Sequence, residues 1–127
     1  MELRDFNSPE APVAIGGYSQ AVEVRNAVRT LYVSGQIPVA RNGDVPETFG
    51  EQARLAWRNV EAQLQGAGMT LGNLVKVTIY LSDRRFGAEN SVVRQEVMKG
   101  RTPALTVVIA GIFDAAWLLE IEGVAYG

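Results

Sequence analysis

The chain has 127 residues, 47% of them hydrophobic, and a formal net charge of -2. This length and composition suit one compact domain with a real core, so we expect a single domain over residues 1–127. Cysteine and histidine are both absent. Their absence removes disulfides, thiolate nucleophiles and the side chain that most often binds metals or titrates near neutrality. We therefore expect no metal, no cofactor and no Ser-His-Asp machinery.

Charge and hydropathy also limit the partners. The apolar runs are short and the N-terminus opens with charged residues, so neither a membrane span nor a signal peptide is expected. The basic residues are scattered rather than gathered into a stripe, so the field that attracts phosphate backbones is missing. These features predict a cytoplasmic protein that binds neither membranes nor nucleic acid.

The N-terminal part is expected to be β-structure. Residues 18–24 and 31–34 alternate as strands, and Arg25–Ala27 between them is typical of a hairpin connection. Polar residues and glycines end both strands, in Gly16–Ala21 and in Tyr32–Pro38. Such segments are suited to approaching a small ligand.

Two helices are predicted. The first begins at Thr48, which can cap the free amides of the first turn, with Glu51 three positions on. Gly66 and Gly68 mark its end, and its apolar residues recur at helical spacing on one face: Ala53, Ala56, Trp57, Val60, Leu64 and Ala67. The second helix is predicted over residues 86–98.

Three further strands complete the pattern, over residues 74–81, 105–109 and 117–125. The first has its apolar residues on one face only. The order β-β-β-α-β-α-β-β predicts an α/β (α+β) domain, with a mixed sheet and both helices packed on one face. The other sheet face carries a half-apolar surface, which favours a symmetric homo-oligomer.

Six motifs in register give the chain a family resemblance. They are Gly16–Ala21, Tyr32–Pro38, Val75–Thr78, Leu81–Asp83, Arg101–Ala104 and Glu120–Glu122. The chain resembles the RidA/YjgF family of enamine/imine deaminases, formerly called the endoribonuclease L-PSP family. The resemblance implies a chorismate-mutase-like fold and a homotrimer whose ligand clefts lie between subunits.

The resemblance also implies a site. Glu120 would position the water that attacks an imine carbon, Tyr18 would contribute its ring and hydroxyl, and Ser34 a hydroxyl or backbone contact. Imine hydrolysis needs a placed water and a proton shuttle, which a carboxylate supplies without histidine. Tyrosine in a strand and serine before a glycine also have ordinary structural explanations.

One position departs from the family. Deaminating members carry an arginine after the Pro-Ala pair, where it clamps the substrate carboxylate, and this chain has Leu105. Arg101 lies four residues earlier and is the candidate replacement. We expect a RidA-like protein that binds a small imine, enamine or carbonyl metabolite and releases ammonia by hydrolysis, with a substrate range altered by Leu105. The alternatives are a non-catalytic binding or regulatory trimer and, less favoured, an endoribonuclease.

Overall fold

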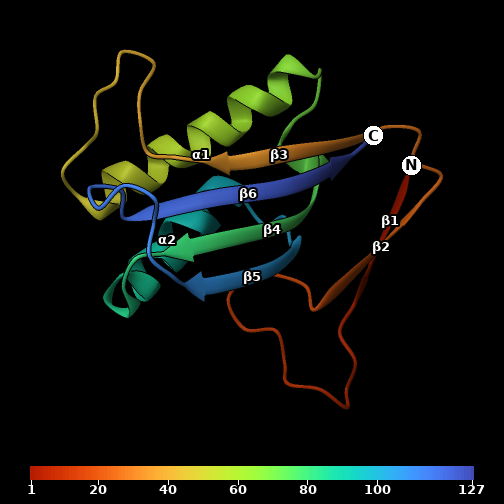
Figure 1. Ribbon diagram of the computed structural model, residues 1–127. Helices are drawn as coiled ribbons and strands as arrows, with labels where there is room; N and C mark the ends of the chain where they lie inside the picture. The colour runs from red at the N-terminus through yellow and green to blue at the C-terminus, as the bar shows by residue number, and fades with distance from the viewer.

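The computed structural model describes residues 1–127 and contains the predicted order of elements (Figure 1). The elements are β1 (Glu2–Phe6), β2 (Ala21–Arg25), β3 (Thr30–Gln36), α1 (Phe49–Gly66), β4 (Leu74–Leu81), α2 (Gly87–Met98), β5 (Ala104–Ile109) and β6 (Leu119–Tyr126). Two short 3-10 turns, η1 (Leu71–Asn73) and η2 (Arg84–Phe86), precede β4 and α2. The β-β-β-α-β-α-β-β order is therefore confirmed.

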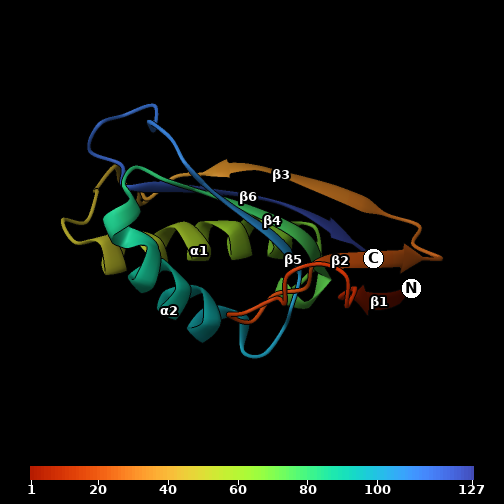
Figure 2. The ribbon, with the colours of Figure 1, turned by 90° about the horizontal axis from the view of Figure 1, so that it is seen from below.

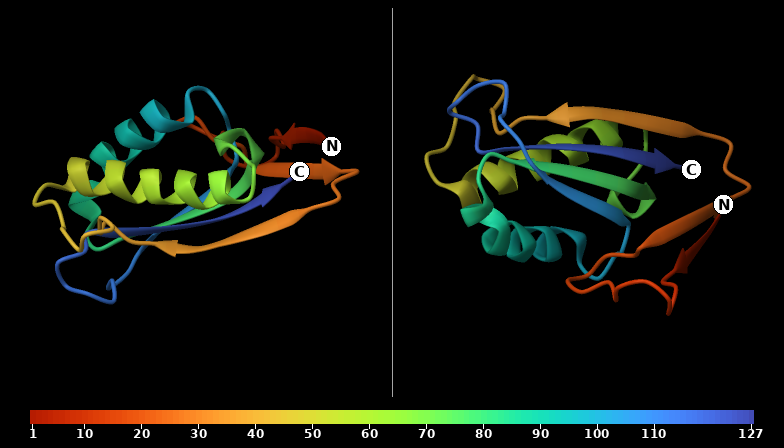
Figure 3. Two further views of the ribbon diagram at one scale, coloured as in Figure 1. Left: turned by 90° about the horizontal axis from the view of Figure 1, so that it is seen from above. Right: turned by 60° about the horizontal axis from the view of Figure 1, so that its bottom comes forward.

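The main sheet has four strands in the order β3-β6-β4-β5. β4 and β5 run parallel, whereas the β3–β6 and β4–β6 pairs are antiparallel. Both helices lie on the same side of this sheet (Figures 2 and 3). The predicted mixed sheet with two helices on one face is confirmed.

The core forms between α1 and the helix side of the sheet. The hydroxyl of Thr48 accepts a hydrogen bond from the backbone N–H of Glu51 at 3.3 Å, which fixes the start of α1 as predicted. Trp57 is only 1% exposed and shares one apolar cluster with Ile79 of β4 and Ile121 of β6. Burial of this stripe holds the helix layer on the sheet.

The predicted hairpin between the second and third strands is wrong. β2 pairs with β1 in a separate two-stranded sheet, and β3 pairs with β6. Asn26 takes a left-handed φ of 57°, and the backbone N–H groups of Val28 and Arg29 both bind the carbonyl of Gly127. The link between β2 and β3 is thus held by the C-terminal residue. Alternating polarity shows a strand but not its neighbour.

The sheet face opposite the helices is uncovered in the single chain. Along β4 the alternating residues Lys76, Thr78 and Tyr80 are half-buried on this open face. Tyr32 of β3 is 78% exposed, and Val108 of β5 is also exposed. None of the helices combines the length and apolar character that crossing a membrane requires.

Candidate functional site

Glu120 extends from β6 onto the open face, directly over Gly35 of β3. Its neighbours Leu119 and Ile121 are buried on the helix side, so strand alternation turns Glu120 the other way. A β-carbon built at Gly35 would overlap Oε2 of Glu120 and lie 2.7 Å from its Cδ. Only glycine leaves room for this carboxylate, which makes Gly35 part of the site that sequence reasoning did not single out.

Ser34 lies next to this carboxylate, on an irregular part of β3. The β3–β6 register shifts between Val33 and Gln36, so the ladder is interrupted at Ser34 and Gly35. Ser34 is exposed and lines a cavity of about 360 Å³, together with Tyr32, Lys76, Thr78, Glu122 and Val124. The acid that lines the Ser34 cavity is thus Glu122, while Glu120 lies over the adjacent Gly35.

The second carboxylate on the open face, that of Glu122, already has a hydrogen-bond partner. The hydroxyl of Tyr80 donates a 2.8 Å hydrogen bond to Oε1 of Glu122. This hydrogen bond, followed by desolvation, raises the pKa of Tyr80. Nearby, Nζ of Lys76 donates to the hydroxyl of Thr106 at 2.6 Å, and desolvation lowers the pKa of Lys76.

Glu120 differs from Glu122 in its partners. No side-chain hydrogen bond to Tyr80 or Lys76 holds it, and neither of the two ion pairs of the chain includes it. Its carboxylate is half-buried and faces away from the core. Of the two acids on this face, Glu120 is the one left to bind a water or a ligand.

Tyr18 lies in a loop that is attached to the far end of β5. Ser19 forms a parallel bridge to Ala104, and its N–H binds the carbonyl of Pro103. Gly16 and Gly17 before it have φ angles of 110° and 77°, which other residues adopt only at a cost. The Gly-Gly pair is therefore required by the shape of this loop.

Arg94 of α2 anchors the same loop. Its guanidinium donates to the carbonyl of Gly16 at 2.6 Å and to that of Gly17 at 3.1 Å. Arg94 is 5% exposed, has no carboxylate partner, and its burial lowers its pKa. Its Nε and the Oδ1 of Asn90, one helical turn earlier, are buried without hydrogen-bond partners.

Sequence reasoning did not select Arg94, although a signal was present. Asn90, Val93, Arg94, Val97 and Met98 follow the spacing of one helical face. All five are buried or half-buried. An arginine within an apolar stripe is a sign of a buried cation with a specific partner.

Leu105 sits on the opposite side of the sheet from Glu120. In the β4–β5 register Leu105 pairs with Val77, which is buried toward the helices, and Leu105 packs against the core from the sheet edge. Ala104 pairs with Lys76, whereas Glu120 pairs with Tyr80. Four residues of strand separate these pairs by about 13 Å. One chain therefore does not bring Leu105, or the Tyr18 loop attached at Ala104, together with Glu120.

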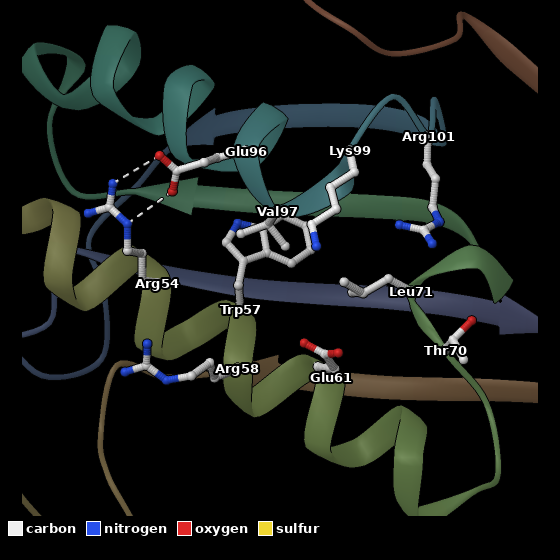
Figure 4. Close-up of a pocket in the computed structure, with 10 residues that line it drawn as sticks. All are labelled: Arg54, Trp57, Arg58, Glu61, Thr70, Leu71, Glu96, Val97, Lys99 and Arg101. Carbon is white, nitrogen blue, oxygen red and sulfur yellow. Dashed lines mark hydrogen bonds and ion pairs between the residues drawn. The ribbon is translucent and has the colours of Figure 1, made fainter.

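Arg101 is not turned toward the open face. Its Nη1 donates to the carbonyl of Met98 at 3.2 Å, and the side chain lies in a groove of the helix layer beside Thr70 and Leu71 (Figure 4). The structure separates Arg101 from Glu120 and Ser34, which lie on the other side of the sheet. Within one chain, Arg101 therefore does not take the place of the missing arginine beside Glu120.

Comparisons with known proteins agree with this fold. The sequence pattern of the family described as "Endoribonuclease L-PSP" matches residues 8–127. A rat protein named 2-iminobutanoate/2-iminopropanoate deaminase is 36% identical over 123 residues, which cover 94% of this chain and 87% of the rat protein.

Solved structures support the same assignment. Escherichia coli TdcF, crystallised with bound serine, has a TM-score of 0.72 and 30% identity, covering 98% of each chain. The Rid-family protein YyfB from Yersinia pestis has a TM-score of 0.87 over the full length of both chains, and at 24% identity this likeness shows the fold alone. With the family match over residues 8–127, these likenesses show that the chain belongs to the endoribonuclease L-PSP family, the family of the Rid proteins.

Proposed function

We propose that this protein hydrolyses a small imine or enamine to a carbonyl compound and ammonia, with Glu120 as the catalytic residue. The observation that carries the proposal is the free carboxylate of Glu120 over Gly35, beside the cavity lined by Ser34. The name of the 36%-identical rat relative supports the reaction type.

The chemistry needs only water and one carboxylate. Glu120 accepts a proton from water while the oxygen adds to the carbon of a protonated C=N group. The proton then passes from Glu120 to nitrogen, and as the C–N bond breaks and ammonia leaves, Glu120 takes the proton of the new hydroxyl group, so the carbonyl compound forms without an oxidant or reductant. A positioned acid–base group of this kind contributes about 10²–10⁴-fold to a rate.

We propose further that the cleft forms between copies of the chain in a homotrimer. Leu105 and the Tyr18 loop lie near the Lys76–Ala104 pair, whereas Glu120 pairs with Tyr80 four residues further along β4, so a second copy is needed to bring Leu105 to Glu120. Exposed Tyr32 and Val108 on the open strands supply apolar surface for such contacts. The site residues then come from two subunits.

Leu105 sets the substrate range in this proposal. An aliphatic side chain that packs on the core offers no bidentate partner to a carboxylate. A carboxylate-bearing imine therefore lacks a charged hydrogen bond of about 1.5–3 kcal/mol. We expect imines without a carboxylate to be favoured. The alternative, a trimer that binds without turnover, predicts ligand binding but no ammonia release.

The test is ammonia release from imines generated in situ by an amino-acid oxidase or an amine oxidase. We expect acceleration by the purified protein and its loss in Glu120→Gln. Glu47→Gln is the matched control, because it makes the same change at an exposed acid in the loop before α1. Equal rates with and without protein, for all imines, would leave the binding-only alternative as the better account.

A further inference from the structure

A second groove of about 400 Å³ lies between α1 and α2 (Figure 4). Its walls come from α1, from η1 and from the end of α2 with the residues that follow it. The helix layer covers the side of the sheet opposite to the open face. This groove is therefore separate from Ser34 and Glu120.

The charges of the groove are paired at one end only. Arg54 and Glu96 form a two-pronged ion pair at 3.1 and 3.3 Å. Elsewhere in the groove Arg58, Lys99 and Arg101 have no acidic partner, and Glu61 on α1 has no basic partner. Figure 4 shows Lys99 and Glu61 extending from facing walls, so opposite charges face each other across an open space.

The backbone after α2 holds Lys99 in a conformation that is unfavourable for a lysine. Lys99 has φ 51° and ψ 51°, the left-handed conformation in which glycine is usual at the end of a helix, and Gly100 follows with φ 84°. This turn carries Lys99 and Arg101 into the groove lining.

The floor of the groove is apolar. Trp57 and Leu71 lie at its base but are only 1% and 8% exposed, so the half-buried Val97 supplies accessible apolar surface above them (Figure 4). The Nε1 of Trp57 is buried and has no acceptor. A ligand for this groove thus needs an apolar body beside its charged groups.

We propose that the α1–α2 groove is a binding site for a free α-amino acid with an apolar side chain. The ligand carboxylate lies between Lys99 and Arg101, its ammonium group faces Glu61, and its side chain packs on Val97 above the buried Trp57. Two opposite charges and an apolar part are what the lining offers, and an α-amino acid carries all three. This site does not depend on the proposed deaminase activity.

Leucine titration tests the site, followed by the fluorescence of Trp57 in a Trp117→Phe background and by calorimetry. Trp57 and Trp117 are the two tryptophans of the chain, so the variant reports on the groove alone. We expect saturable leucine binding, and at least about tenfold weaker binding of 4-methylpentanoate and of isopentylamine, each of which lacks one charge. Equal affinity for 4-methylpentanoate would contradict the role of Glu61.

Substitutions test whether leucine binds in the groove or elsewhere on the molecule. Lys99→Gly is expected to weaken leucine binding about tenfold or more with little change in Tm, because glycine accepts the left-handed turn. Glu61→Gln should weaken it similarly, whereas Gln63→Ala, on α1 outside the groove, should not. Leucine binding that survives Lys99→Gly, or that Glu120→Gln abolishes, overturns the proposal, as does the absence of any binding in the millimolar range.

Discussion

The carboxylate of Glu120 occupies the space that a side chain at Gly35 would need. The β-carbon of any other residue at position 35 would overlap Oε2 of Glu120. The interrupted register of β3 at Ser34 and Gly35 places the smallest residue beneath the carboxylate that we assign to catalysis. Backbone shape and acid position are thus coupled at this point of the sheet.

Gly35→Ala is therefore expected to impair the reaction although it removes no functional group. The methyl group displaces Glu120, and we expect the ammonia-release rate to fall about 10²-fold, approaching the loss in Glu120→Gln. Steady-state kinetics measure this, with Tm as the check on folding. Gly111→Ala is the control, since its β-carbon meets nothing within 4 Å. Full activity in Gly35→Ala would show that the observed position of Glu120 is not required.

Leu105→Arg is expected to restore selectivity for acidic imines. The new guanidinium offers a bidentate partner to a substrate carboxylate, worth about 1.5–3 kcal/mol, or about 10- to 150-fold in kcat/KM. Tm should fall because Leu105 packs against the core. Leu105→Met keeps the packing and adds no charge. It should therefore leave the selectivity unchanged and alter the stability only slightly. A gain in kcat/KM that is equal for acidic and uncharged imines would contradict the assignment.

Arg94→Met should release the loop that carries Tyr18. The variant loses the two hydrogen bonds to the carbonyls of Gly16 and Gly17. Each hydrogen bond from a charged donor contributes about 1.5–3 kcal/mol, offset in part by the apolar burial of methionine. We expect faster hydrogen exchange at the N–H of Ser19 and a lower kcat/KM. Val92→Ala, at an exposed position of α2, is the control. Unchanged exchange at Ser19 would show that Arg94 does not hold the loop.

The hydrogen bond between Tyr80 and Glu122 predicts a late phenol titration. It raises the pKa of Tyr80 above the usual value near 10. The protonated phenol is favoured in the folded state, so this stabilisation is complete below the unfolded pKa and is lost as pH rises through the higher folded pKa. Absorbance titration should show a phenol transition above the usual value near 10 that is absent in Tyr80→Phe. A high-pH transition that persists unchanged in Tyr80→Phe would contradict the effect of the hydrogen bond.

The sequence predicts the helices and strands more fully than it predicts which of them lie next to one another. Apolar spacing and the Thr48 cap locate α1, and strict alternation locates β4, because each is a local property of the chain. The course of the chain after β2 depends on the left-handed turn at Asn26 and on hydrogen bonds to Gly127. Gly127 lies at the other end of the sequence. Periodicity alone therefore gave the wrong hairpin.

Prediction of the candidate site from the sequence is limited in the same way. Glu120, Tyr18 and Ser34 are candidates that the family motifs point out, whereas the close approach of Gly35 to the Glu120 carboxylate is visible only in the structure. Arg94 becomes visible only when the loop at Gly16 folds back on α2. Arg101, close to Leu105 in sequence, lies in the helix layer because its side chain binds the carbonyl of Met98.

The most direct test of the shared cleft is complementation between two inactive variants. Glu120→Ala and Tyr18→Ala proteins, each inactive alone, are mixed, dissociated and reassembled, and ammonia release is measured. If Tyr18 of one subunit and Glu120 of another complete each cleft, the mixture forms some intact clefts and regains a fraction of the activity. A mixture as inactive as its components, although light scattering shows mixed trimers, would contradict a site built from two copies of this chain.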